Sequence, residues 1–269
     1  MSRHGWWLGM LLWLSLPAVA VERLTVRVLE TLPHDINAFT QGLEWHDGRL
    51  FESTGLYGQS SLRWLEGDSG EPGRRIMLAD SLFGEGLARV EDRLVQLTWR
   101  EGLALVWQLP ELRLLKAFSY QGEGWGLCFD GDSLWMSDGS ATLQRRDPAD
   151  FTLQRRLNVR LGGVPQGRLN DLACVGRHIY ANVWKQARIL RIRKDSGEVD
   201  AVIDASALLP LSQRVSHHEA VLNGIAHDQR SGDFYLTGKW WPRLFRVRFV
   251  QAPGAPDAGN SATPALSAR

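Results

Sequence analysis

The strongest constraint on the fold is a stretch of sequence that occurs five times along the chain. The copies are FTQGLEWHDGRLFEST from Phe39, FGEGLARVEDRLVQLTW from Phe83, GEGWGLCFDGDSLWMSDG from Gly122, GRLNDLACVGRHIYANVW from Gly167 and VLNGIAHDQRSGDFYLTGKWW from Val221. Each copy has a polar or aromatic residue, then Gly or Asp, then an apolar position, a turn and a second apolar run. Self-similarity of this kind is typical of repeat architectures, in which each copy forms one structural unit.

The spacing within the copies predicts antiparallel strands. The second apolar run starts eight residues after the Gly or Asp in four copies and ten in the fifth, at Leu50, Leu94, Leu134, Ile179 and Phe234. Asp-Gly pairs in two of the turns supply the positive φ of tight hairpins. Further segments of alternating apolar residues follow, such as SLRWLE and RILRIRK. Each unit is therefore expected to hold about four short strands, as a propeller blade does.

These units predict an all-β fold, a five-bladed β-propeller. The fifth copy ends after LFRVRFV without a fourth strand, whereas RLTVRVLE, residues 23–30, has alternating β character and no copy of its own. We expect this N-terminal strand of the mature chain to close the ring, which removes an exposed sheet edge. A β-sandwich would also contain many short strands, but it would not show this repeat.

The two ends of the chain differ from the repeat region. Residues 1–20, MSRHGWWLGMLLWLSLPAVA, show the basic start, apolar run and small residues of a signal peptide. The apolar run is short for a membrane span, although a retained anchor is the alternative. Residues 21–250 form the propeller domain, and 251–269, rich in Pro, Ala, Gly and Ser, are expected to be disordered. We expect a periplasmic or secreted protein.

The charge balance and the cysteine content argue against some classes of partner and metal site. The chain has 31 Lys and Arg against 30 Asp and Glu, without a basic block interleaved with aromatics, so nucleic acid is not an expected partner. After signal cleavage no further long apolar run would bind a membrane. The two cysteines, Cys128 and Cys174, fit either one disulfide or two buried thiols. Without a third thiol, zinc-thiolate chemistry has no support.

Equivalent positions of the copies should face the central channel of a propeller. The residues before the Gly or Asp are Gln41, Glu85, Trp125, Asn170 and Asn223. The positions five residues beyond the start of the second run are Gly55, Trp99, Gly139, Trp184 and Lys239. If both sets converge at one mouth, they form a pocket with one acid, one ammonium, three amides and three tryptophans. Aromatic walls with few polar groups are typical of a small-molecule site.

Each of these residues also has a structural interpretation. Amides at strand starts often satisfy backbone groups at turns, Lys239 can be a solvated loop residue, and Glu85 can be an ion-pair partner. His217-His218-Glu219 suggests a metal site, but adjacent histidines on an extended chain point in opposite directions. No hydrolase or nucleotide motif is present. The repeat by itself therefore predicts a small-molecule or peptide site and no reaction.

Several segments resemble the motifs of a known family and occur in the same order along the chain. The motifs HDINAFTQGL, ESTGLYGQSSLR, FGEGLA, GEGWGL, YANVW and LTGKWWPRLFRV, between His34 and Val250, are similar to those of the plant-type and bacterial glutaminyl-peptide cyclotransferases, or glutamine cyclotransferases. The resemblance implies a five-bladed propeller that converts N-terminal glutaminyl residues of peptides and proteins into pyroglutamyl residues with release of ammonia. The sequence departs from the family's pattern at Ile36-Asn37, where proline is more frequent, and at Asp171, where Glu is commoner.

Carried over by motif, the family's active-site residues fall on Phe39, Gln41, Glu85, Trp99, Trp125, Asn170, Trp184 and Lys239. Three are expected to be catalytic, with Glu85 moving protons as general base and acid, and Lys239 and Asn170 stabilising the oxyanion. Five are expected to bind substrate: Phe39, Gln41, Trp99, Trp125 and Trp184.

The expected chemistry needs no metal ion. The family resemblance leaves room for a structural divalent ion in the channel, and we expect a monomer. A non-catalytic exported propeller that binds peptides or glycans is the alternative function. A metal-dependent lactonase would need several inward carboxylates around calcium, and only Glu85 lies in the two sets.

Overall fold

The computed structural model describes residues 20–66, 69–70, 72–213 and 215–254. Apart from Ala20, the expected signal peptide lies outside these residues, as does most of the expected tail. The described chain is all-β, as predicted, with one short 3-10 helix, η1 (Leu211–Gln213). In this part of the chain, no helix has the length and apolar character needed to cross a membrane.

Most strands belong to five units of four, in which neighbouring strands are antiparallel. Unit 1 holds β2 (Thr40–His46), β3 (Arg49–Thr54), β4 (Ser61–Glu66) and β5 (Pro72–Met77). Unit 2 holds β6 (Gly84–Val90), β7 (Arg93–Thr98), β8 (Leu103–Gln108) and β9 (Arg113–Ser119). Unit 3 holds β10 (Leu127–Phe129), β11 (Leu134–Met136), β12 (Thr142–Arg146) and β13 (Leu153–Asn158).

The remaining units combine consecutive strands with the start of the chain. Unit 4 holds β16 (Leu169–Val175), β17 (His178–Val183), β18 (Arg188–Arg193) and β19 (Val199–Asp204). Unit 5 holds β20 (Leu222–His227), β21 (Phe234–Gly238), β22 (Arg243–Gln251) and β1 (Glu22–Pro33). A small separate hairpin is formed by β14 (Arg160–Leu161) and β15 (Val164–Pro165).

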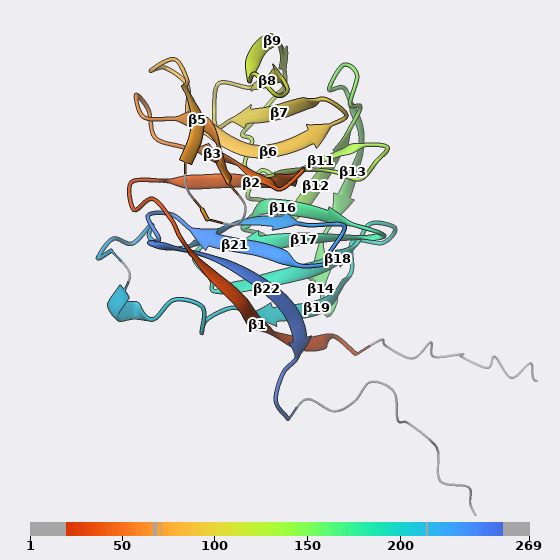
Figure 1. Cartoon of the computed structure of the whole chain (residues 1–269). Helices are drawn as coiled ribbons and strands as arrows, with labels where there is room; N and C mark the ends of the chain where they lie inside the picture. Colours follow the sequence, from red (N-terminus) through yellow and green to blue (C-terminus); the bar gives the residue numbers. More distant parts are fainter. Residues whose placement is uncertain (1–19, 67–68, 71, 214, 255–269) are drawn as a thin grey trace, which may run out of the picture.

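The N-terminal strand β1 has two partners. It pairs antiparallel with β22 over Leu24–Pro33, which confirms the expected pairing of the chain start with the last strand. Figure 1 shows the red β1 beside the blue β22. Its first residues, 22–25, also pair in parallel with β19, so units 4 and 5 share one eight-stranded sheet. This second pairing was not predicted, and it uses the edge of β1 opposite to β22, since Leu24 and Thr25 pair with both strands.

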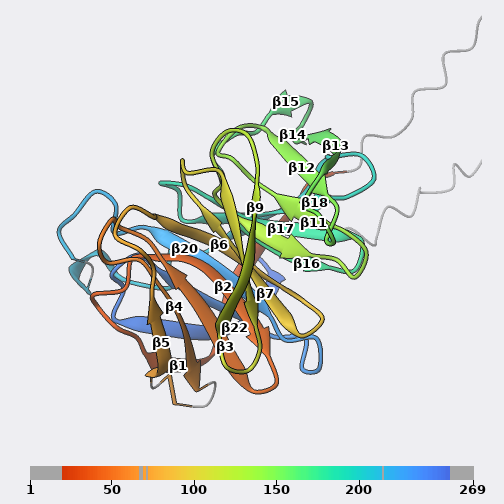
Figure 2. The same cartoon turned by 90° about the horizontal axis from the view of Figure 1, so that it is seen from above.

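The first strands of the units form the centre of the fold. They contact one another in a closed cycle, β2 to β6, β10, β16, β20 and back to β2. Figure 2 shows β2, β6 and β16 in the interior, with β5 toward the edge of the molecule. The residues that begin these strands are therefore brought around one axis.

Glycine permits this close approach of the first strands. A Cβ atom on Gly42 would lie 2.7 Å from the backbone nitrogen of Leu87, and one on Gly86 would lie 2.6 Å from the Cα atom of Gly126. A Cβ atom on Gly126 would lie 2.1 Å from the carbonyl oxygen of Asn170. Any side chain at these positions would force the strands apart.

The fourth unit has Asp171 where its neighbours have glycine. The side chain is fully buried, and its Oδ2 atom accepts hydrogen bonds from the backbone N–H of Leu43 at 3.2 Å and of Ile225 at 2.8 Å. These donors belong to β2 and β20. The carboxyl group thus joins three first strands, and burial raises its pKa well above the usual value despite these hydrogen bonds.

A buried polar network fixes the segment between β1 and β2. His34 contacts Glu52 at 3.0 Å, and Glu52 also accepts a hydrogen bond from Thr40 at 2.6 Å and from Arg63 at 2.8 Å. Burial raises the pKa of Glu52, but Arg63 and His34 outweigh it and hold that pKa well below the usual range. The ionised carboxylate of Glu52 therefore holds the start of β2 and the segment before it against β3.

The hydrophobic core lies between neighbouring units. Leu127 and Leu134 of unit 3 pack in one cluster with Val95 and Leu97 of unit 2. Cys128 of β10 and Cys174 of β16 form a disulfide, so of the two open alternatives the structure shows the bridge. The bridge joins the first strands of units 3 and 4 across 46 positions of sequence.

Removal of the disulfide is expected to destabilise the fold without changing its strand pairing. Closing a loop of this length lowers the entropy of the unfolded chain, which corresponds to about 2–4 kcal/mol in the free energy of unfolding. We expect the Cys128→Ser/Cys174→Ser double variant to lose this amount in urea denaturation, and reduced wild-type protein to match it. Equal denaturation midpoints for oxidised wild type and double variant would contradict the prediction.

Candidate active site

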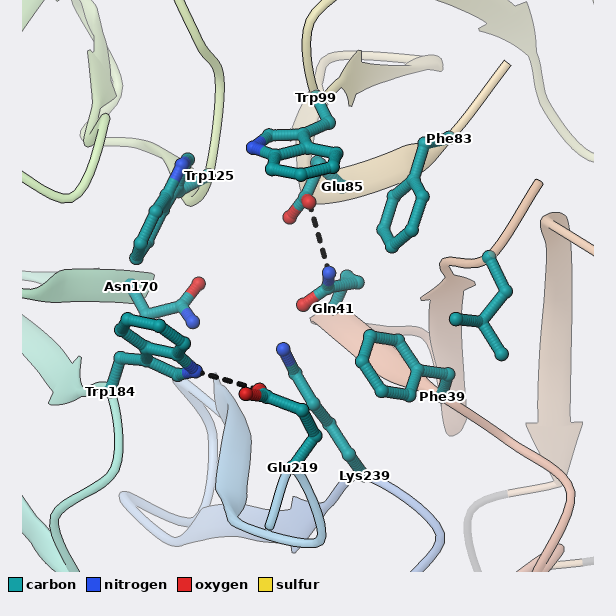
Figure 3. Close-up of a pocket in the computed structure, with 11 residues that line it drawn as sticks. Phe39, Gln41, Phe83, Glu85, Trp99, Trp125, Asn170, Trp184, Glu219 and Lys239 are labelled. Carbon is teal, nitrogen blue, oxygen red and sulfur yellow. Dashed lines mark hydrogen bonds between the residues drawn. The ribbon is translucent and has the colours of Figure 1, made fainter. Parts of the chain in front are cut away.

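A cavity of about 290 Å³ lies at the starts of the first strands. Its lining residues come from all five units: Phe39, Gln41, Leu56, Phe83, Glu85, Trp99, Trp125, Asn170, Trp184, Glu219 and Lys239. All eight residues that the sequence predicted for the site lie among them (Figure 3). Seven of the ten equivalent positions therefore converge on one pocket, whereas Asn223, Gly55 and Gly139 do not line it, so the pocket has two of the three expected amides.

Local structure explains why these side chains meet. Gln41, Glu85 and Asn170 lie at the starts of the first strands β2, β6 and β16. Trp99 directly follows the end of the second strand β7, and Trp184 and Lys239 follow β17 and β21 in the same way. In an antiparallel hairpin the start of one strand lies beside the end of the next. One set thus forms the floor of the pocket and the other its rim.

Glu85 is the acid at the floor of the pocket. Its side chain is buried, with 4% of the residue exposed, and it accepts a hydrogen bond from Nε2 of Gln41 at 2.9 Å. Burial raises the pKa of Glu85 well above its usual value. The charge of Lys239 opposes this rise, whereas those of Glu123, Asp171 and Glu101 add to it. Desolvation therefore outweighs the effect of Lys239 on the pKa of Glu85.

Lys239 is the cation of the pocket and is also desolvated. Only 4% of the residue is exposed, and its Nζ atom lies 4.4 Å from the centroid of the Phe39 ring. Burial lowers the pKa of this ammonium group, while Glu85 and Glu219 raise it. Glu85 and Lys239 are each shifted toward their neutral form, which is the condition in which groups exchange protons readily near neutral pH.

The amide side chains of Gln41, Asn170 and Asn223 differ in whether their existing hydrogen bonds leave them free to bind a ligand. Gln41 donates to Glu85, and its Oε1 atom accepts from Nδ2 of Asn223 at 3.1 Å. Asn223 also donates to the carbonyl oxygen of Thr40 at 3.0 Å and does not line the cavity, so it has the backbone-satisfying role. Asn170 lines the cavity, and its buried Oδ1 atom has no hydrogen-bond partner. Gln41 therefore orients Glu85, and Asn170 is the amide available to a ligand.

The aromatic side chains of the pocket pack in two groups. The ring centroids of Phe83 and Trp99 are 5.4 Å apart, and those of Phe39 and Phe83 are 6.1 Å apart. Across the pocket, Trp125 and Trp184 meet edge to face, with centroids 5.5 Å apart and ring planes at 85°. These contacts fix the ring orientations, because aromatic pairs favour such edge-to-face and offset geometries.

Three lining residues were not predicted from the sequence: Leu56, Phe83 and Glu219. Phe83 stands two positions before Glu85, as Phe39 stands two positions before Gln41, so alignment of the copies contained this signal. Glu219 accepts a hydrogen bond from Nε1 of Trp184 at 2.9 Å. It comes from the loop before β20 and does not align with a predicted site position of the other copies, so its proximity to the histidine pair was the only cue.

The histidine pair itself does not behave as an extended segment. The rings of His217 and His218 stack with centroids 4.5 Å apart, because the chain turns here. The expectation that they point in opposite directions was therefore wrong. Within the described ranges, no group of three or more His, Cys, Asp or Glu side chains is arranged to hold a metal ion.

Comparisons with known proteins identify the family. The family model described as Glutamine cyclotransferase matches residues 9–249. A curated glutaminyl-peptide cyclotransferase of Arabidopsis thaliana is 36% identical over 230 residues, which cover 84% of this chain and 72% of the plant protein.

Solved structures give the same result. The crystal structure of Myxococcus xanthus glutaminyl cyclase is 42% identical, with a TM-score of 0.82, and the match covers 86% of this chain and 99% of that chain. The WD40 repeats of RRP9 are similar in fold alone, at 12% identity and a TM-score of 0.51 over 83% of this chain and 97% of that one. The match of the family model to most of the sequence and the identity to the plant enzyme show that this chain belongs to the glutamine cyclotransferase family.

Proposed function

We propose that this protein is a glutaminyl-peptide cyclotransferase that converts N-terminal glutaminyl residues into pyroglutamyl residues and releases ammonia, with Glu85 as the group that moves the protons. The observation that carries this proposal is a single buried carboxyl group with a raised pKa at the floor of a pocket with aromatic walls. Family membership supports the reaction, and the geometry supports the assignment of roles.

The proposed architecture is a five-bladed β-propeller closed by the N-terminal strand. Its support is the closed cycle of contacts among the first strands of five units, together with the pairing of β1 with β22. In this arrangement each unit is one blade, and the pocket lies at one mouth of the central channel.

The reaction is an intramolecular acyl transfer. The α-amino nitrogen of the substrate forms a bond to the γ-carboxamide carbon, and the bond from that carbon to the amide nitrogen breaks. Since both reacting groups belong to one residue, holding them in a cyclic conformation contributes much of the acceleration. The attacking nitrogen must lose a proton and the departing nitrogen must gain one. We assign both transfers to Glu85, because one carboxyl group between the two nitrogens can accept and then return the proton.

Negative charge develops on the amide oxygen when the tetrahedral intermediate forms. Lys239 and the amide of Asn170 line the same cavity as Glu85 and are the proposed donors to that oxygen. Such donors typically lower the barrier by several kcal/mol when they are fixed before the reaction begins. Gln41 is already engaged with Glu85 and Asn223, so we assign it to orientation of the acid.

The aromatic wall is proposed to hold the glutaminyl side chain and exclude water. Water in the pocket would hydrolyse the amide to glutamate in competition with ring closure. Phe39, Trp99, Trp125 and Trp184 line the cavity with Phe83, so apolar surface surrounds the reacting groups. This wall also accounts for the desolvation of Glu85.

Glycine at one rim position makes room for this wall. Gly139 occupies the position that corresponds to Trp99 and Trp184, and a Cβ atom there would lie 2.7 Å from Cη2 of Trp125. Its φ is +79°, which side-chain-bearing residues rarely adopt. The indole of Trp125 therefore occupies space that a fourth side chain on the rim would take.

Catalysis is proposed to need no metal ion, since acid–base transfer by Glu85 and oxyanion stabilisation by Lys239 supply both requirements. A structural divalent ion in the channel stays a separate proposal. The oxygen that fits it best is Oδ1 of Asp171, which is buried without a hydrogen-bond partner. Calcium prefers six or more oxygen ligands, so backbone carbonyl groups and water would have to supply the others.

The protein is further proposed to act as a monomer outside the cytoplasm, in the periplasm or as a secreted enzyme. The Cys128–Cys174 disulfide supports this, because such bridges persist in oxidising compartments. The amino-terminal signal-like sequence is consistent with the same location.

Substitution of the acid tests the proposed function directly. We expect wild-type protein to convert a Gln-initiated dipeptide amide to its lactam with release of ammonia, with and without chelator. Glu85→Gln should lower kcat by at least about 100-fold, because the amide cannot accept a proton. An exposed control, Glu111→Gln, should retain wild-type kcat. Failure of wild type to form lactam would instead favour a non-catalytic binding protein.

The pH dependence follows from the raised pKa of Glu85. The carboxylate form is required to accept the proton, and this form is lost as pH falls through the pKa, which burial places well above the usual 4.5. We therefore expect the acidic limb of the kcat profile to lie above pH 4.5. A limb at or below the usual value would show that Glu85 is solvated in the complex.

A substitution on the rim tests the aromatic wall. Gly139→Ala should displace the indole of Trp125 and lower kcat/KM by about 10- to 100-fold, because small misplacements of a positioning group carry effects of that size. The matched control is Gly131→Ala, whose φ is also positive, at +95°, but whose added Cβ meets no atom within 4 Å. Equal kcat/KM values for the two variants would contradict the role of Trp125.

A further inference from the structure

The indole N–H groups of the pocket wall point to carboxylates that the reaction does not use. Oε2 of Glu123 accepts a hydrogen bond from Nε1 of Trp99 at 2.8 Å and another from Nε1 of Trp125 at 3.0 Å. Trp99 follows β7 of unit 2, whereas Trp125 precedes β10 of unit 3. One oxygen atom thus holds two indole rings that belong to different units.

A cation completes this arrangement on the outer face of Trp99. The guanidinium carbon of Arg100 lies 3.7 Å from the centroid of the Trp99 ring, and Nε of Arg100 donates to Oε1 of Glu123 at 3.1 Å. Burial raises the pKa of Glu123, but its hydrogen bonds from Trp125, Trp99 and Arg100 outweigh this and lower it, so the group stays ionised. An ionised acceptor forms stronger hydrogen bonds than a neutral one.

The same arrangement occurs a second time, on the opposite side of the pocket. Oε2 of Glu219 accepts from Nε1 of Trp184 at 2.9 Å, and its Oε1 atom contacts Nζ of Lys185 at 2.9 Å. Lys185 lies over the Trp184 ring, 4.4 Å from its centroid. Figure 3 shows Glu219 to the right of Trp184, with the hydrogen bond dashed. In both cases a tryptophan is followed by a basic residue, and the carboxylate comes from the segment before the next unit.

Indole rings need such a constraint because packing leaves one side of each ring against an open cavity. A ring with no atoms on one face gains little from dispersion there and can tilt into the space. A hydrogen bond from the ring nitrogen to a fixed carboxylate removes that freedom. The edge-to-face contact of Trp125 with Trp184 then links the two arrangements, so that two carboxylates control three indoles.

We propose that Glu123 and Glu219 are positioning residues, which hold Trp99, Trp125 and Trp184 in the orientation that fits the cyclising glutaminyl group. The proposal rests on the proposed function for its kinetic consequence, whereas its structural consequence does not depend on any reaction. Neither residue contacts the reacting atoms in this role, because the oxygens described bind indole and cationic groups.

The chain contains a matched control for this chemistry. Oδ2 of Asp130 accepts from Nε1 of Trp135 at 2.9 Å and from Nζ of Lys194 at 2.9 Å. The combination of carboxylate, indole and cation is the same, but Asp130 and Trp135 do not line the pocket. Loss of this bond therefore reports the general cost of removing a carboxylate–indole contact.

The experiment compares Glu123→Ala, Glu219→Ala and Asp130→Ala by kinetics and by the NMR signals of the indole N–H groups. The signals of Trp99 and Trp125 should move in Glu123→Ala. The signal of Trp184 should move in Glu219→Ala, and that of Trp135 in Asp130→Ala. For a Gln-initiated dipeptide amide, the two pocket variants should raise KM about tenfold, the effect of one lost hydrogen bond to a charged group, with a smaller change in kcat. Asp130→Ala should leave KM within about twofold of wild type.

Three outcomes would overturn the proposal, and a fourth would overturn only the proposed function. Unmoved indole signals in Glu123→Ala or Glu219→Ala would show that the bonds do not form in solution, and moved signals with wild-type KM would show that the bonds do not position the wall. An increase in KM in Asp130→Ala equal to that of the pocket variants would assign the effect to general destabilisation. Absence of turnover in the wild type would overturn the proposed function, while moved signals would still support the indole contacts.

Should an alanine variant not fold, Glu123→Gln keeps an acceptor oxygen and should raise KM by less than tenfold.

Discussion

The close approach of the first strands around one axis is the constraint on which the rest of the structure depends. Gly42, Gly86 and Gly126 permit it, since a Cβ atom at any of them would collide with a neighbouring strand. The residue before each glycine then points toward the mouth of the channel, and Gln41 and Glu85 come within 2.9 Å of each other. A packing requirement of the backbone thus determines where the reactive side chains lie.

Enclosure then determines their electrostatics. In a low-dielectric cavity the cost of desolvation opposes the mutual attraction of Glu85 and Lys239, and the directions of both pKa shifts show that desolvation is the larger effect. Glu123 and Glu219 behave differently, because they lie nearer the solvent, with side-chain exposures of 37% and 18%, and are paired with cations. The site therefore separates a carboxyl group that can exchange protons from carboxylates that stay charged.

Repeat spacing was sufficient to predict much of this arrangement. The second strands begin at or within a residue of Leu50, Leu94 and Leu134, and all eight predicted site residues line one cavity. The family resemblance supplied the reaction and the choice among equivalent positions. Glu219 was not predicted, because it stands four positions before Asn223 whereas its counterpart Glu123 stands two positions before Trp125, so the two carboxylates do not align in the copies. The pairing of β1 with β19 was missed because the repeat contains no signal for a partner on the second edge of β1.

The same desolvation suggests how substrate binding prepares the proposed reaction. An α-ammonium group that enters beside the Glu85 carboxylate forms a charged pair in a site that disfavours both charges. Transfer of one proton to Glu85 removes both charges and creates a nucleophilic amine beside a carboxylic acid. After attack, that acid can protonate the departing nitrogen, and the carboxylate can then take the second proton from the lactam nitrogen. The released ammonia accepts this second proton from Glu85 and leaves as ammonium, so each turnover restores the ionised Glu85 without another base.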